Sequence, residues 1–117
     1  MILALDLASD RPLFNQIVDG VKRSLVDGQL EPGESLPPGR ELAAALDVSL
    51  ETVQRAYRQL ADEGVVTSRV GRGTRVSDPV DIGLIELSSA VDNIVEQARS
   101  VGVSKDRLLD MINSVYG

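Results

Sequence analysis

The sequence predicts an α+β fold: a winged helix-turn-helix domain over residues 1–78, followed by a two-helix, all-α tail over residues 79–117. Two short helical patterns separated by a brief turn at Ser49 predict the helix-turn-helix. The apolar period changes to two directly after Gly64, as it does in a β-hairpin. An apolar seam with heptad spacing then begins at Leu84, which is typical of helices that pair with one another.

The first helix is predicted to begin at Pro12 and to end before Gly28. Proline suits the first turn of a helix, and glycine suits the left-handed position that follows the last turn. The short apolar segment over residues 2–6 predicts a strand ahead of this helix. The apolar face of the helix is predicted to consist of Phe14, Ile17, Val18, Val21 and Leu25.

The second and third helices are predicted over residues 40–46 and 50–62. Ser49 is a good N-cap for the third helix, because its hydroxyl can accept from a backbone N–H of the first turn. Glu51 in that turn complements the helix dipole. The buried stripe of the third helix is predicted to consist of Val53, Ala56, Tyr57 and Leu60.

The hairpin, or wing, is predicted from two strands over residues 65–70 and 74–76. Gly71, Arg72 and Gly73 predict the turn between them, because glycine tolerates positive φ. In isolation this tripeptide indicates only a tight turn. Directly after a helix-turn-helix, it favours contact with a phosphate or the minor groove of DNA, with Arg72 as the charged group.

The tail is predicted to contain two helices after a hinge at residues 77–79, the last of them capped by Ser104. It is too short to form a core of its own without disulfides, a metal or a partner. We therefore expect it to form a homodimer; folding of both helices onto the first domain is the alternative. The residues expected at the dimer interface are Leu84, Leu87, Val91, Ile94, Ala98, Val101, Leu108 and Ile112.

Composition excludes several classes of chemistry. The chain has no cysteine and no histidine, which excludes disulfides, cysteine or histidine catalysis and the usual zinc sites. We expect no enzyme activity, no cofactor and no metal. No apolar run approaches the ~18 residues of a membrane span, and the start of the chain carries Asp6 without a basic region. The sequence therefore predicts a cytoplasmic protein with no membrane partner.

Charge is distributed unevenly along the chain. The net charge of −6 taken alone argues against nucleic acid. Residues 52–77, however, contain five arginines against two acidic residues. A cationic strip on an anionic body can direct one face towards an anion, although the same arginines could simply form a solvated face.

The start of the third helix carries the side chains best suited to reading DNA. The first residues of such a helix reach base edges in the major groove of winged-helix complexes. Gln54 can bond adenine in a bidentate manner, and Arg55 can do so with guanine. Thr52 can contact a thymine methyl group or a phosphate. Leu50 is expected to be exposed, where it could contact a thymine methyl group.

Several short motifs occur in order at the spacing of a known family. They include residues 12–17 (Pro-Leu-Phe-Asn-Gln-Ile), 28–33 (Gly-Gln-Leu-Glu-Pro-Gly), 40–43 (Arg-Glu-Leu-Ala) and 71–74 (Gly-Arg-Gly-Thr). With these motifs, residues 11–77 resemble the GntR family of bacterial repressors. The short tail resembles that of the YtrA subfamily, whose members lack the large effector domain of their relatives.

The resemblance implies a homodimeric repressor that binds a palindromic operator in double-stranded DNA, often near genes for an ABC transporter. It also implies that Arg40, in the helix before the turn, holds a phosphate or reaches a base. Leu50, Gln54 and Pro38 depart from the residues common in the family. The full set of residues expected to bind DNA is Arg40, Ser49, Leu50, Thr52, Gln54, Arg55, Arg58, Gly71, Arg72, Gly73 and Thr74.

Two further hypotheses accompany DNA binding. A small-molecule effector could bind between the tail and the winged domain and release the DNA. The side chains that could line its pocket include Leu84, Leu87, Ile94 and Tyr116. Alternatively, the acidic balance and Leu50 would fit a protein-interaction module, derived from a winged helix, that no longer binds DNA. Steep salt dependence of binding to duplex DNA would argue against that module.

Overall fold

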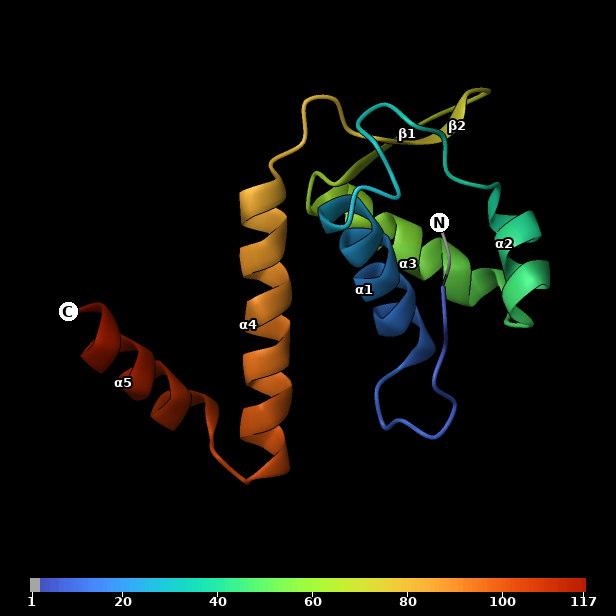
Figure 1. The fold of residues 1–117 in the computed structure, drawn as a ribbon. Helices are drawn as coiled ribbons and strands as arrows, with labels where there is room; N and C mark the ends of the chain where they lie inside the picture. The colour runs from blue at the N-terminus through green and yellow to red at the C-terminus, as the bar shows by residue number, and fades with distance from the viewer. Residues whose placement is uncertain (1–2) are drawn as a thin grey trace. The chain divides into compact units, whose positions relative to one another are not determined.

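The structure is a computed structural model that describes residues 3–117. The first of its two compact units ends at Glu86, and the second is Leu87–Gly117. The division therefore falls within a helix. In chain order (Figure 1), the elements are α1 (Leu13–Val26), α2 (Gly39–Leu46), α3 (Leu50–Asp62), β1 (Val66–Arg69), β2 (Gly73–Val76), α4 (Ile82–Ser100) and α5 (Lys105–Tyr116).

The core of the first unit forms where α1 and α2 pack against α3. The residues that are buried in α1 and α3 agree with the apolar faces predicted for these two helices. Of the face predicted for α1, only Phe14 is partly exposed. α1 ends at Val26, and Gly28 adopts a φ of 78°, as expected for a glycine that follows a helix. The fully or almost fully buried residues of the two helices are Ile17, Val18, Val21, Leu25, Val53, Ala56, Tyr57 and Leu60.

A left-handed residue makes the tight turn between α2 and α3. Asp47 has a φ of 54° and a ψ of 47°, a conformation that aspartate tolerates better than most residues. Ser49 is the N-cap of α3, and its Oγ accepts from the backbone N–H of Thr52 at 3.1 Å, which confirms the predicted cap. At the start of α2, Pro38 makes no side-chain capping bond, because it has no acceptor to offer.

The wing is an antiparallel pair whose register runs from Val66 opposite Val76 to Arg69 opposite Gly73. Its base is held by the loop before α2. The N–H of Leu36 donates to the Thr74 carbonyl at 2.8 Å. The N–H of Gly33 donates to the Val76 carbonyl at 3.0 Å, and the N–H of Val76 donates to the Glu34 carbonyl at 2.8 Å. Residues 33–36 thus run beside β2, and these three bonds fix the position of the wing relative to α2.

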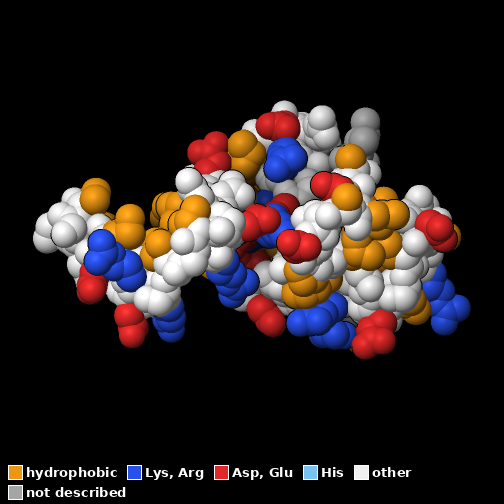
Figure 2. Space-filling model, turned by 90° about the horizontal axis from the view of Figure 1, so that it is seen from below, with side chains coloured by type: hydrophobic (Ala, Val, Ile, Leu, Met, Phe, Trp, Pro, Cys, Tyr) orange, Lys and Arg blue, Asp and Glu red, His pale blue; other side chains and the backbone are white. Residues whose placement is uncertain are grey.

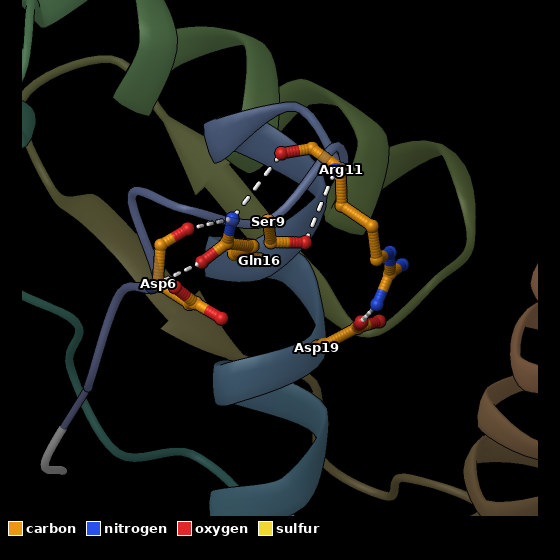
Figure 3. A network of polar contacts seen from close by, with 5 residues as sticks. All are labelled: Asp6, Ser9, Arg11, Gln16 and Asp19. Carbon is orange, nitrogen blue, oxygen red and sulfur yellow. Dashed lines mark hydrogen bonds and ion pairs between the residues drawn. The ribbon is translucent and has the colours of Figure 1, made fainter.

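The predicted strand over residues 2–6 is wrong for its described part, because residues 3–6 form no strand. Ile2 lies outside the described residues. Asp6 bonds a side chain instead of a neighbouring strand: its N–H donates to Gln16 Oε1 at 2.7 Å, and Gln16 Nε2 donates to its carbonyl at 3.0 Å (Figure 3). Leu3 and Leu5 pack against the core. Without an open sheet edge beside it, an apolar segment buries its side chains in a non-strand conformation.

The first turn of α4 belongs to the first unit. Ile85 is buried in its core, and Asp81 Oδ1 accepts from the N–H of Leu84 at 3.0 Å, which caps the helix. In the second unit, Ser104 caps α5 as predicted, accepting from the N–H of Arg107 at 3.2 Å. No residue of α5 is buried.

Candidate nucleic-acid interface

A groove in the first unit collects side chains from α2, α3 and the wing. We call it the reading groove. Its floor includes Tyr57, and several of the residues predicted to bind DNA line it. Residues from separate segments of the chain therefore meet on one face, because α2 and β1 both pack against α3 and β2 pairs with β1. The lining residues are Pro38, Gly39, Arg40, Leu50, Gln54, Tyr57, Arg58, Ala61, Ser68 and Thr74.

Gln54 and Arg58 project from α3 into this groove. They are four residues apart and therefore lie on the same face of the helix. Both are exposed, as is Arg40 on α2. The reading groove thus presents one amide and two guanidinium groups, which are the side chains that bond base edges and phosphates.

Tyr57 supports the groove from below. Its hydroxyl donates to the carbonyl of Pro37 at 2.7 Å, which links α3 to the segment that leads into α2. Burial raises the pKa of this hydroxyl to about 12, and the negative charge of Glu41 adds to the shift. The hydroxyl is therefore neutral and able to donate at physiological pH.

The exposed position predicted for Leu50 is wrong, because its side chain is half-buried. Its Cδ1 would lie only 3.2 Å from a Cβ added at Gly39. Leu50 therefore packs against the first residue of α2 and holds α2 against α3. Only the remaining part of its surface lines the reading groove.

Ser49 and Thr52 are engaged with one another at the start of α3. Their hydroxyls lie 2.8 Å apart, and the Ser49 hydroxyl also accepts from the N–H of Thr52. Both side chains lie beside the reading groove but do not line it. Their hydroxyl groups hold the first turn of α3 in place and can still form a hydrogen bond with a phosphate.

Arg55 also lies outside the reading groove. Its guanidinium carbon sits over the ring of Phe14 from α1, 3.9 Å from the ring centroid. The structure therefore separates it from Gln54 and Arg58, although all three are exposed or partly exposed residues of one helix.

The tip of the wing has the backbone that the sequence predicts. Gly71 and Gly73 have φ values of 78° and 71°, which only glycine adopts without strain. The N–H of Arg72 donates to the carbonyl of Arg69 at 3.0 Å and closes the turn. The Arg72 side chain is exposed.

Ser68 is a groove residue that the sequence reasoning missed. Its hydroxyl lies 2.8 Å from that of Thr74 across the wing, and both line the reading groove. The signal was the register of the hairpin, which pairs these two residues. Small hydroxyl residues facing each other across a hairpin point to the same side of it.

The arginines of α2, α3 and the wing are not neutralised by carboxylates. Within residues 3–117, none of six arginines on α2, α3 and the wing forms an ion pair, whereas Arg11 pairs with Asp19 and Lys22 with Glu63. A cation that pairs with no carboxylate keeps its full charge for an external anion. The six are Arg40, Arg55, Arg58, Arg69, Arg72 and Arg75.

The predicted dimer residues of α4 form an exposed apolar stripe. Leu84 and Leu87 are 59% and 60% exposed, and Ala98 is the exception at 8%. On α5, Ile112 is exposed and Leu108 is half-buried. Figure 2 shows hydrophobic side chains at the surface of the second unit, at the left of the view. These two helices leave most of their apolar side chains in contact with water.

Other kinds of site have little support within the described part of the chain. Among residues 3–117, no group of three or more acidic side chains is arranged to hold a metal ion. No helix in that range is long and apolar enough to cross a bilayer.

Comparison with known proteins supplies a family match. Residues 13–76 match the model of the gntR family of bacterial regulatory proteins. The chain is 29% identical to the HTH-type transcriptional repressor YtrA of Bacillus subtilis, over 97% of the chain and 92% of that protein.

Solved structures resemble this one as well, and two of them serve as examples. YtrA from Sulfolobus acidocaldarius, a GntR-family transcription factor, has 33% sequence identity and a TM-score of 0.66, over 86% of this chain and 99% of that one. The AraR DNA-binding domain in complex with the operator ORX1 has 25% identity and a TM-score of 0.57, over 66% of this chain and 95% of that one.

Proposed function

Because this chain belongs to the GntR family of bacterial regulatory proteins, we propose that it represses transcription by binding a palindromic operator as a homodimer. The family resemblance stated from the sequence is confirmed, and so is the winged helix-turn-helix fold. Membership makes the chain a DNA-binding transcriptional regulator and not an enzyme. The operator symmetry, the dimer and the direction of regulation are the proposal.

The observation that carries the proposal is the reading groove with its arginines that lack an ion pair. Gln54 and Arg58 on α3, with Arg40 on α2, offer hydrogen-bond donors on one exposed face. In this proposal α3 enters the major groove and Gln54 reads a base edge. Arg40 and Arg58 bind phosphates or bases beside it, and Arg72 at the wing tip binds backbone or minor groove.

The remaining predicted contacts support this placement of α3. Ser49, Thr52 and Thr74 carry hydroxyls that can bond phosphate oxygens. Gly71 and Gly73 allow the wing backbone to approach the DNA closely, because neither has a side chain. Leu50 contributes mainly by holding α2 against α3, and the groove side of its methyl groups remains available for a thymine methyl group.

The dimer part of the proposal is supported by the exposed seam of α4 and by α5, none of whose residues is fully buried. Such apolar surface is stabilised when a second copy removes it from water. A two-fold dimer would bind two half-sites that are related by symmetry, with centres ~34 Å or a multiple of this apart. The AraR complex shows that a similar domain binds an operator in that protein.

Selection of bound fragments from a pool of random duplex DNA tests the proposal. We expect a motif with two inverted half-sites. A single half-site would contradict the dimer. Enrichment of no motif, together with binding that hardly changes with salt concentration, would instead favour a protein-interaction module.

Variants of Gln54 and Arg72 test the assignment of contacts on the selected duplex. Gln54→Ala is expected to weaken binding by about 1–3 kcal/mol and to relax the preference at one base pair of each half-site. Arg72→Ala is expected to weaken binding to all sequences and to lower the slope of log K against log salt by about 1. Gln97→Ala, on α4, is the control. Unchanged affinity in both groove and wing variants would refute the assignment.

Release by a small-molecule effector stays a hypothesis from the sequence. Thermal-shift screening checks it: an effector must change both the melting temperature and the affinity for the selected duplex. A ligand that changes only one of them is not an effector in this sense.

A further inference from the structure

The contact between Arg55 and Phe14 is a feature that the proposed function does not use. The guanidinium carbon lies 3.9 Å from the ring centroid, within the range of a cation–π interaction. Within residues 3–117, Arg55 forms no ion pair with a carboxylate. The ring is therefore the group that holds this cation, and its charge is not neutralised.

The position of Arg55 on α3 decides what it can reach. Gln54 and Arg58 line the reading groove on the side of α2 and the wing. Arg55 follows Gln54 by one residue, which is a rotation of about 100° around the helix. Its guanidinium lies over a residue of α1. α3 thus carries cations on two flanks of its exposed face, and Arg55 is on the flank next to α1.

We infer that Arg55 binds a backbone phosphate at the edge of the major groove, and that Phe14 is the positioning residue that holds its guanidinium there. The inference rests on the proposed entry of α3 into the major groove. A helix in that groove has its base-reading side towards the floor and its flanks towards the two phosphate backbones. This phosphate contact replaces the contact with guanine that the sequence predicts for Arg55.

Stacking on a ring leaves the guanidinium able to bind an anion. The ring contacts the face of the planar group, and the five N–H donors lie around its edge. A phosphate can accept two of these donors at once. Because the ring already restricts the side chain, less rotamer entropy is lost when the phosphate binds.

The test uses the full chain, the duplex selected with the unmodified protein, and a mixed-sequence duplex of equal length. Arg55→Gln is expected to weaken binding to both duplexes by the same factor and to lower the slope of log K against log salt by about 0.9. Phe14→Leu is expected to weaken binding to both about 2- to 5-fold. In the Arg55→Gln protein, Phe14→Leu is expected to have no further effect.

Phe14→Tyr is the matched control, because it keeps the ring and should restore the affinity that leucine loses. Thermal unfolding of each variant shows whether the fold is intact; because Arg55 is exposed and loses only its contact with the ring, Arg55→Gln should lower the melting temperature only slightly. If Phe14→Leu lowers DNA affinity by the same factor in the unmodified protein and in the Arg55→Gln protein, Phe14 does not act by positioning Arg55.

Loss of preference at one base pair in Arg55→Gln, with the salt slope unchanged, would show a base contact and overturn the phosphate role. Both outcomes can be told apart from the result expected if the protein does not bind DNA at all. In that case the unmodified protein would bind neither duplex with salt-dependent affinity.

Discussion

Lys22 and Glu63 form an ion pair that connects the middle of α1 to the end of α3. The Lys22 side chain is 1% exposed, and its Nζ lies 2.7 Å from Glu63 Oε1, whose side chain is 32% exposed. A buried ammonium group is costly unless a carboxylate and other polar groups compensate it. The pair therefore favours the packing in which the end of α3 lies against α1.

Removing the two partners of this pair should have unequal effects. Glu63→Ala leaves the ammonium group buried and should lower the free energy of unfolding by about 3 kcal/mol. Lys22→Met leaves a carboxylate that water can reach, so its cost should be smaller. Urea unfolding followed by circular dichroism measures both. A larger loss for Lys22→Met than for Glu63→Ala would contradict this account.

Tyr57 makes stability sensitive to alkaline pH. Its pKa is raised from 10.0 to about 12 in the folded protein, first by burial and then by Glu41. Between these values the unfolded chain loses the phenol proton while the folded chain keeps it. The contribution to stability is therefore fully present below pH 10 and falls as the pH rises towards 12, by up to about 2–3 kcal/mol.

The control for this prediction is Tyr116→Phe, because Tyr116 is the other tyrosine and is 91% exposed. In that variant, the ultraviolet absorbance of tyrosinate should report Tyr57 alone and should rise only near pH 12. Ionisation near pH 10 in the folded protein would show that the hydroxyl is not protected.

At the scale of elements, α3 and α5 begin with the same device but differ in packing. Ser49 and Ser104 both accept from the N–H three residues later, at 3.1 and 3.2 Å. The cap of α3 supports a helix with four buried residues, whereas α5 has none. The two serines are therefore a matched pair for measuring what a cap contributes to each element.

Ser49→Ala is expected to lower the free energy of unfolding of the first unit by about 1 kcal/mol. It should also weaken DNA binding, because the start of α3 borders the reading groove. Ser104→Ala should leave the stability of the first unit and the base preference unchanged. Urea unfolding and titration of the selected duplex measure the two effects. An equal loss of stability from both variants would mean that α5 shares the cooperative unfolding of the core.

At the scale of the whole molecule, DNA affinity should depend on the apolar seam of α4. The double variant Val91→Glu, Ile94→Glu places charges on two exposed seam residues. We expect it to be a monomer in sedimentation experiments and to bind the palindromic duplex at least 10-fold more weakly, because two half-sites are then bound independently.

The control is Asn93→Glu, which adds a negative charge at an exposed position of α4 outside the seam. It should remain a dimer. Because the seam is exposed in the single chain, neither variant should change the folding of the first unit. Dimers in the double variant would place the interface on another surface.

Local chemistry along the chain specifies the order and type of nearly all the helices and strands. The apolar stripes of α1 and α3, the cap at Ser49 and the glycines of the wing tip each depend on neighbours within a few residues. The strand expected over residues 2–6 failed for the same reason: a strand needs a distant partner, and local pattern does not say whether one is present.

Which side chains share a surface depends instead on how the folded elements pack together. It grouped Gln54 and Arg58 with Ser68 from the wing, and it placed Arg55 over Phe14 on the other flank of α3. It also turned Leu50 into a packing residue against Gly39. These outcomes depend on how helices and hairpin pack against one another across long stretches of chain. Residue spacing along one helix does not specify that packing.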